Sequence, residues 1–277
     1  MQPPPEPTSI DLKQLRLRYA GTCVACGATL PQGAQALYHP ASKTVRCAAC
    51  PAEPAFAEAA PINCGTAGAS AQREHDRRAA KREAAIRERF GRRLGGIILA
   101  LTHEPQSTRA WAKGARGEQE LAAALDGLPD VVVLNDRRVP GTLGNIDHLV
   151  IAPAGLFVVD AKRYDGHLRI RDRGGLFRTD ERLYVGGRDC SDLADNMAWQ
   201  VTAVETLLES VGYKVAATPV LCFIGVDWPL LFPPDSFRGV RLENRRSLRK
   251  LICATRALEA AEIGRLARIL ATEFPAK

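Results

Sequence analysis

The chain has 277 residues, more than the roughly 100–200 of a typical domain, so we expect one large domain and a smaller module. Its 46% hydrophobic and 25% charged residues are ordinary for a globular protein and exclude global disorder. Of the net charge of +7, residues 73–93 supply +5, with nine Lys/Arg against four Asp/Glu. Such a segment either binds nucleic-acid phosphates or forms a solvated helix.

The beginning of the chain predicts neither a secretion signal nor a membrane span. Residues 1–20 begin MQPPPEPTSI, which has several prolines and no apolar run, and we interpret them as a flexible tail. The longest apolar run, 95–101, is far shorter than the roughly 20 residues that a bilayer crossing needs. We therefore expect a cytoplasmic protein without membrane contact.

Residues 21–66 form a cysteine-rich module. Two pairs with two-residue spacing, Cys23/Cys26 and Cys47/Cys50, predict a tetrahedral Zn²⁺ site of the zinc-ribbon kind. Four cysteine ligands leave no open position, so the zinc is expected to be structural. Two disulfides or free thiols are the alternative, and His39 or Cys64 could replace one ligand. The remaining cysteines, which are Cys190, Cys222 and Cys253, lie on apolar stretches and are expected in the core.

The rest of the chain divides into a basic helical linker (67–107), a mixed α/β domain (108–255) and a C-terminal helix (256–277). Within the linker, 71–94 has helical spacing. Ser107 or Thr108 could begin the first helix of the α/β domain, which ends near Gly127. The expected strands are 131–134, 148–152, 156–160, 168–171, 183–185 and 220–224. A long helix is expected to begin at Ser191 or Asp192, and two further helices are expected at 247–254 and 258–271.

A hairpin at 145–162 carries the most informative polar residues. Two β-rich apolar runs flank a break at Pro153 and Ala154; if these two residues form the loop, paired residue numbers add up to 307. Asp147 then lies opposite Asp160. Two carboxylates about 5 Å apart repel by roughly 3 kcal/mol, which favours a bound divalent cation such as Mg²⁺ or Mn²⁺. A polar strand edge with a simple salt bridge is the alternative.

Three more polar residues are expected to converge on the aspartates. Lys162 lies two residues beyond Asp160 and therefore on the same strand face. Glu118 shares a helical stripe with Leu121 and Leu125, and Gln200 interrupts the apolar stripe of a later helix. A carboxylate on a core-facing stripe is costly unless it is paired or binds a metal, although both residues could simply mark the edge of a stripe.

These motifs resemble the nuclease-related (NERD) domain of the PD-(D/E)xK, restriction-endonuclease-like superfamily. They are GARGE ending at Glu118, GNID ending at Asp147, VDAK from Val159 to Lys162 with Gly166 following, and the stretch from Asn196 to Gln200. The resemblance covers about 108–225 and implies a mixed sheet flanked by helices. It makes Asp147 and Asp160 metal ligands, Lys162 the catalytic lysine, Glu118 a helix-borne acid supporting the metal and Gln200 an accessory residue. Ile146 stands where the signature has proline.

The first functional hypothesis is a Mg²⁺-dependent nuclease that hydrolyses phosphodiester bonds, with DNA as the expected substrate and a 5′-phosphate product. The second is an inactive zinc-containing adaptor that binds nucleic acid or protein. An acid/base sugar hydrolase is disfavoured, because Lys162 should keep both aspartates ionised and a general acid needs a raised pKa. In the first hypothesis, the zinc module and residues 73–93 help to hold DNA.

Overall fold

A computed structural model describes residues 13–23, 27–39, 44–48, 61–102, 105–175, 178–254 and 257–277. The chain separates into two compact units, Met1–Pro61 and Ile62–Lys277. Within the described residues, no helix combines the length and apolar character needed to cross a membrane.

The first unit is a small β structure. Its strands are β1 (Lys13–Arg16), β2 (Gly21–Thr22), β3 (Thr29–Leu30), β4 (Gln35–His39) and β5 (Thr44–Cys47). They form a three-stranded sheet in the order β1-β4-β5 and a β2–β3 pair. Among the described residues of this unit, the buried hydrophobic cluster consists of Leu17, Cys23, Leu30 and Ala36. A core this small supplies little folding energy, so such modules usually need an additional crosslink or metal.

The second unit is a mixed α/β domain. Its helices are α1 (Ala69–Leu101), α2 (Gln106–Leu125), α3 (Ser191–Ser210), α4 (Arg245–Cys253) and α5 (Ala260–Glu273). Its strands are β6 (Val132–Arg138), β7 (Asn145–Ala152), β8 (Gly155–Asp172), β9 (Glu181–Val185), β10 (Arg188–Asp189), β11 (Ala217–Asp227), β12 (Ser236–Phe237) and β13 (Val240–Glu243). The strands form one eight-stranded sheet in which β8 and β11 are parallel, which confirms the expected mixed sheet.

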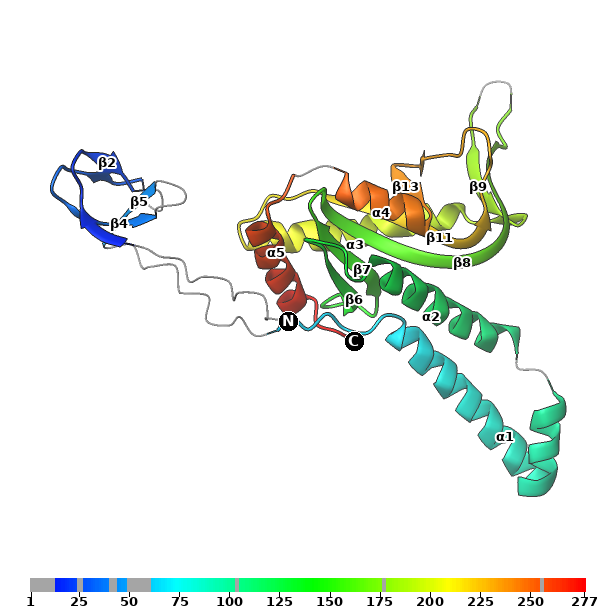
Figure 1. The fold of residues 1–277 in the computed structure, drawn as a ribbon. Helices are drawn as coiled ribbons and strands as arrows, with labels where there is room; N and C mark the ends of the chain where they lie inside the picture. Colours follow the sequence, from blue (N-terminus) through cyan, green and yellow to red (C-terminus); the bar gives the residue numbers. More distant parts are fainter. Residues whose placement is uncertain are drawn as a thin grey trace, which may run out of the picture. The chain divides into compact units, whose positions relative to one another are not determined.

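Helices cover both faces of this sheet (Figure 1). On one face α3 and α5 bury side chains such as Met197, Val204 and Leu266. On the other face α2 and α4 bury Leu121 and Leu248, among others. Alternate residues of β7 and β8 enter the two clusters, as the period of two in a strand requires. The apolar stripes of the helices thus determine which sheet face each helix covers.

The hairpin between β7 and β8 has the register expected from the sequence. Ala152 pairs with Gly155 across a two-residue turn, and Leu149 pairs with Val158. The last pair of the ladder is His148 with Val159, and the next position away from the turn is occupied by Asp147 on β7 and Asp160 on β8. The aspartates therefore lie at the point where the regular ladder ends.

Strand β8 is longer than the sequence suggested, because the expected strands 156–160 and 168–171 are one continuous element. Strand β11 runs alongside it from Leu156 to His167 and holds the polar intervening stretch in the sheet. On its other edge, β8 pairs with β7 only up to Val159 and with β9 only from Leu168. The edge between these two partners carries Asp160 and Lys162.

Helix α1 extends the helix expected at 71–94 but breaks at Gly91, which has φ 71° and ψ 171°. Beyond the break the chain folds back on itself. The backbone of Arg87 approaches Gly95, and Arg82 donates to the Thr102 hydroxyl at 2.6 Å. Figure 1 shows this return turn at the end of α1. The reversal could not be predicted from the sequence, because Gly91 alone interrupts the helical pattern.

The outer edge of β6 is covered by two chain segments that are distant in sequence. The N–H of Asn135 donates to the carbonyl of Cys64 at 2.7 Å, and that of Arg138 to the carbonyl of Pro275 at 3.0 Å. The fully buried Arg137 side chain donates to the carbonyls of Asn63 and Phe274. The segment before α1 and the end of the chain are thereby held on the sheet.

Candidate functional site

A pocket of about 710 Å³ lies over the open edge of β8. Its walls come from the start of α1, the first half of α2, the start of β7, the middle of β8 and β10. Its charged lining residues are Arg73, Glu74, Arg77, Glu118, Asp147, Lys162, Arg163, Arg188 and Lys277. Six of these nine side chains are cationic, so the rim is suited to an anionic ligand.

Asp147 and Asp160 lie close together at the end of the β7–β8 ladder. The N–H of Ala161 donates to the Asp147 carboxylate at 3.4 Å. Burial raises the pKa of Asp147 well above its ordinary value, and the Asp160 and Glu118 charges and a hydrogen bond with Asp160 raise it further. The facing aspartates predicted from the register are therefore electrostatic neighbours.

Lys162 forms an ion pair with Asp160, two residues earlier on the same strand face. Burial opposes the charge on Lys162, but the Asp160 and Asp147 carboxylates outweigh it and raise the pKa of the ammonium group. Lys162 is therefore a permanent positive charge at neutral pH. It is suited to stabilising an anion and unsuited to accepting a proton.

Glu118 reaches the pocket from α2, where it lies 8% exposed above Leu121. One of its oxygens accepts the backbone N–H of Gly68 at 3.0 Å, at the N-terminal end of α1. Gly68 has φ 73°, and a Cβ there would lie 2.6 Å from the carbonyl oxygen of Ala115. Only glycine permits this close approach of α1 to α2.

Asp136 is a site residue that the sequence analysis missed. It is 1% exposed and accepts the N–H of Ser70 at 2.6 Å, the Ser70 hydroxyl at 2.7 Å and the Asn145 amide at 2.9 Å. The N-terminus of α1 has no capping side chain of its own, and the Asp136 carboxylate accepts hydrogen bonds there in its place. Asp136 thereby also joins α1 to the start of β7. The sequence around it, LNDRR, looks like an exposed strand end and carries no signal for this contact.

Gln200 is not among the residues lining the pocket. It is 8% exposed on α3, between the buried Met197 and Val204, and its side-chain oxygen has no hydrogen-bond partner among the described residues. Its neighbour Trp199 instead contacts the loop before β7, where a Cβ on Gly144 would lie 2.5 Å from the indole ring. Four of the five candidate residues therefore converge, whereas an accessory role for Gln200 stays a prediction.

The ionisation of the site differs from the sequence expectation. Lys162 was expected to keep both aspartates ionised, but burial raises the pKa of Asp147 well above its ordinary value. Burial, followed by the charge of Asp136, also raises the pKa of Glu118 to about 7. The argument from Lys162 against a raised-pKa acid was therefore wrong, because one ammonium group does not offset the desolvation of several carboxylates.

The donor chemistry of the site fits a hard divalent cation. Within the described parts of the chain, no group of three His, Cys, Asp or Glu side chains is arranged to hold a metal ion. However, the three carboxylates of Glu118, Asp147 and Asp160 with the one ammonium of Lys162 carry a formal charge of −2 when ionised. Carboxylate oxygens are the ligands that Mg²⁺ and Mn²⁺ prefer, and a divalent cation would neutralise this charge.

The raised pKa of Glu118 predicts how stability depends on pH without added divalent metal. Folded Glu118 binds a proton up to about pH 7, whereas the unfolded residue loses it near pH 4.5, so its contribution to stability falls as pH rises between these values. The quantity to compare is the free energy of unfolding of the wild type minus that of Glu118→Gln. We expect this difference to fall by roughly 2–3 kcal/mol between pH 5 and pH 8.

Urea unfolding of both proteins at several pH values measures this difference. Burial lowers the pKa of His148 to about 4, so His148 costs stability as pH falls from 6.5. Because this contribution is common to both proteins, it cancels in the difference. A difference that does not change with pH would show that Glu118 does not titrate in this range.

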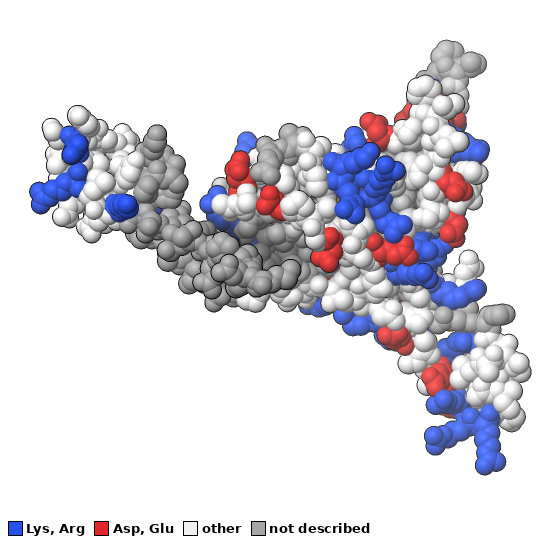
Figure 2. All heavy atoms as spheres, viewed as in Figure 1, with Lys and Arg blue, Asp and Glu red and all other residues white. Residues whose placement is uncertain are grey.

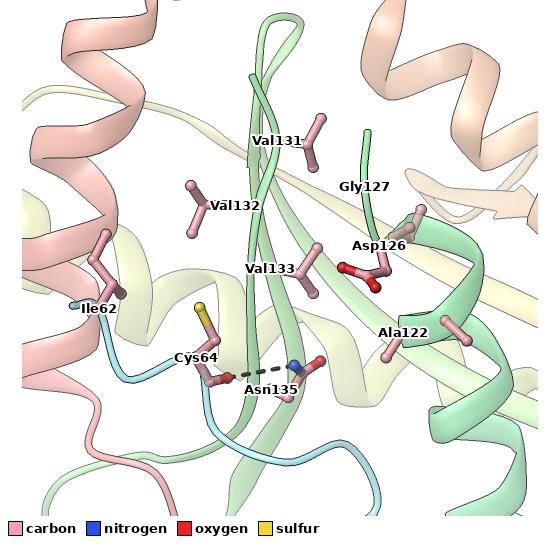
Figure 3. Close-up of a pocket in the computed structure, with 11 residues that line it drawn as sticks. Ile62, Cys64, Ala122, Asp126, Gly127, Val131, Val132, Val133 and Asn135 are labelled. Carbon is pink, nitrogen blue, oxygen red and sulfur yellow. Dashed lines mark hydrogen bonds between the residues drawn. The ribbon is translucent and has the colours of Figure 1, made fainter. Parts of the chain in front are cut away.

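A second pocket, of about 550 Å³, lies between the C-terminal part of α2 and β6. Figure 3 shows Val131, Val132 and Val133 on one side of it and Ala122 and Asp126 on the other. Asp126 is the one charged residue among those lining it. This pocket therefore lacks both the several carboxylates and the cations that line the first pocket.

Two of the four predicted zinc ligands, Cys23 and Cys47, are among the described residues of the first unit. The N–H of Cys47 donates to the sulfur of Cys23 at 3.3 Å, so the first cysteines of the two pairs are adjacent. Gly27 closes a turn onto the carbonyl of Cys23 at 2.9 Å. Cys26, Cys50 and the side chain of His39 lie outside the described residues.

Outside this module, Cys190 and Cys222 are buried, as expected. The expectation of a core position was wrong for Cys253, which is exposed at the end of α4. Leu248 and Ile252 form the buried stripe of that helix, and Cys253 follows Ile252 on the outer side.

Comparison with known proteins finds one family to which part of the second unit is similar. No curated protein and no solved structure matches the chain. A protein-family match does cover residues 113–224, which run from the first half of α2 into β11 and include every candidate residue of the pocket from Glu118 to Lys162. Residues 113–224 of this chain are therefore similar to the nuclease-related domain (NERD) family.

Proposed function

We propose that this chain is a Mg²⁺-dependent nuclease of the PD-(D/E)xK type that hydrolyses phosphodiester bonds, with DNA as its expected substrate. The observation that carries the proposal is the joint placement of Glu118, Asp147 and Lys162 in one cation-rimmed pocket, with Asp160 paired to Lys162. This combination suits a phosphodiester better than a neutral sugar, because the rim cations bind phosphate oxygens.

Asp147 and Asp160, with Glu118 in support, would hold the Mg²⁺ or Mn²⁺ ion. When bound, such an ion supplies an activated water and neutralises charge on a phosphate. Lys162 would hold its positive charge beside the phosphate as negative charge develops there. Arg73, Arg77 and Arg188 would bind the flanking phosphates and orient the strand.

The hydrolysis would break the bond between phosphorus and the 3′ oxygen and leave a 5′-phosphate. Ile146, in place of the signature proline, is fully buried in the core cluster that α3 and α5 cover. The departure from the signature therefore affects packing at the start of β7 rather than the proposed chemistry.

The direct test is cleavage of plasmid DNA and of single-stranded DNA by the purified full-length chain. We expect cleavage with Mg²⁺ and none without it, and a loss of at least about 10²-fold in Asp160→Asn. Glu209→Gln, which changes an exposed carboxylate of α3 outside the pocket, is the matched control. Equal activity of Asp160→Asn and wild type would remove this pocket from consideration.

The inactive adaptor remains a second candidate because of one contact. Glu118 already accepts the N–H of Gly68, so one of its oxygens is occupied. The adaptor predicts that wild-type protein retains nucleic acid at low salt and yields no product with Mg²⁺ or Mn²⁺. The same assay therefore separates the two candidates.

A further inference from the structure

Helix α4 presents a cluster of cations that is not part of the pocket. Arg245, Arg246, Arg249 and Lys250, here termed the α4 patch, are all exposed. They line a hollow of about 380 Å³ with Ala124 of α2. Figure 2 shows the blue side chains gathered over the position of α4.

The α4 patch is held on a rigid and well-anchored helix. Asn244 caps α4 by accepting the N–H groups of Arg246 at 2.9 Å and Ser247 at 3.0 Å, and Ser247 completes a capping box. Leu248 and Ile252 are fully buried on the opposite side. The four cations are therefore fixed on one outward surface of the domain.

Three of the four cations of the α4 patch have no ion-pair partner among the described residues. In α1, Arg77 and Arg78 pair with Glu74 and Arg87 pairs with Glu83, so part of the α1 charge is neutralised within that helix. No ion pair joins Arg246, Arg249 or Lys250 to another residue in the described part of the chain. Arg246, Arg249 and Lys250 are therefore a second group of uncompensated cations, in addition to those of residues 73–93 to which the sequence pointed.

Ion pairs of Glu120 connect the α4 patch to the pocket. Arg163 lines the pocket and pairs with Glu120 of α2, and Glu120 also lies 3.7 Å from Arg245 of α4. Arg116 pairs with the same Glu120 at 3.2 Å. Three cations around one carboxylate leave this connection positively charged, so a basic band runs from the pocket to α4.

We infer that the α4 patch is a second binding surface for the phosphodiester backbone of the nucleic acid whose cleavage is proposed for the pocket. This assignment rests on the proposed function for the identity of the ligand. Guanidinium and ammonium groups bind backbone phosphates regardless of base sequence. An anionic membrane fits less well, because α4 carries no exposed large hydrophobic side chain to enter a lipid surface.

The test is equilibrium binding of a labelled 30-base-pair DNA duplex, with no divalent cation added so that cleavage plays no part. In Arg246→Gln/Arg249→Gln/Lys250→Gln, we expect affinity to fall by at least about 10-fold at 50 mM salt. The slope of log K against log salt should become shallower by about 2–3, since each neutralised phosphate contributes about 0.9. Arg138→Gln/Lys214→Gln/Arg265→Gln removes the same charge from exposed sites elsewhere and should change affinity much less.

An affinity and a slope that are unchanged in the α4 variant with both the duplex and a single strand would overturn the inference. So would a loss of binding to phosphatidylserine vesicles with unchanged binding to the duplex. The same binding measurement is repeated with a 30-nucleotide single strand. A loss of affinity for either form of DNA supports a phosphate-binding surface, and the form that shows the larger loss is the preferred ligand. Because binding is measured without turnover, the inference can hold even if the cleavage test fails.

Discussion

Replacing Lys162 with methionine is expected to slow Mg²⁺-dependent cleavage by about 10²–10³-fold, since methionine keeps the length of the side chain and removes its charge. Lys162 pairs with Asp160 and stays protonated at neutral pH, because the Asp160 and Asp147 carboxylates outweigh its burial. It therefore acts as a fixed charge. Single-turnover cleavage measures the loss at saturating protein.

Lys162→Arg and Lys214→Met make this prediction specific. Arginine keeps the charge and should restore part of the rate, whereas Lys214 is exposed in the loop before β11 and its replacement should have no effect. Urea unfolding of each variant shows whether the fold survives. Wild-type cleavage by a folded Lys162→Met protein would exclude Lys162 from the reaction.

Removing zinc is expected to unfold the first unit and leave the second unit folded. The described core of the first unit has four residues, and Cys47 donates to the Cys23 sulfur. Zinc binding is worth about 10–16 kcal/mol in zinc-finger peptides, far more than a core of this size provides. We expect one zinc per chain by mass spectrometry and, after chelation, rapid proteolysis of residues 13–48 alone.

Cys47→Ala should lose zinc and show the same proteolysis without a chelator. Cys253→Ala changes an exposed cysteine of α4 and should keep one zinc per chain. Protein that contains no zinc as purified, or a first unit that resists proteolysis after chelation, would contradict the predicted site.

The convergence of the candidate residues could be predicted because it depends on short-range periodicity. The two-residue turn after Ala152 sets the pairing of β7 with β8, and the period of two then places Asp160 and Lys162 on one strand face. The helical period places Glu118 on the buried stripe of α2. Each inference spans fewer than twenty residues of chain.

Other features of the site could not be predicted because they join distant segments. Asp136 reaches Ser70 across 66 residues, and Glu118 reaches Gly68 across 50. The raised pKa of Glu118 likewise follows from the burial that α1 and the sheet impose together. Neither contact leaves a periodic pattern in the chain.

The amino-acid sequence by itself determined most of the helices, the hairpin register and the residue types that meet in the pocket, because backbone geometry and apolar periodicity are local properties. Tertiary structure alone decided where β7 and β9 separate along β8, how α1 closes over Glu118 and which cations stay unpaired. These outcomes depend on burial and on charges brought together by packing. In α1, three arginines pair with acidic residues of the same helix, whereas α4 contains no acidic residue and Arg246, Arg249 and Lys250 have no ion pair among the described residues.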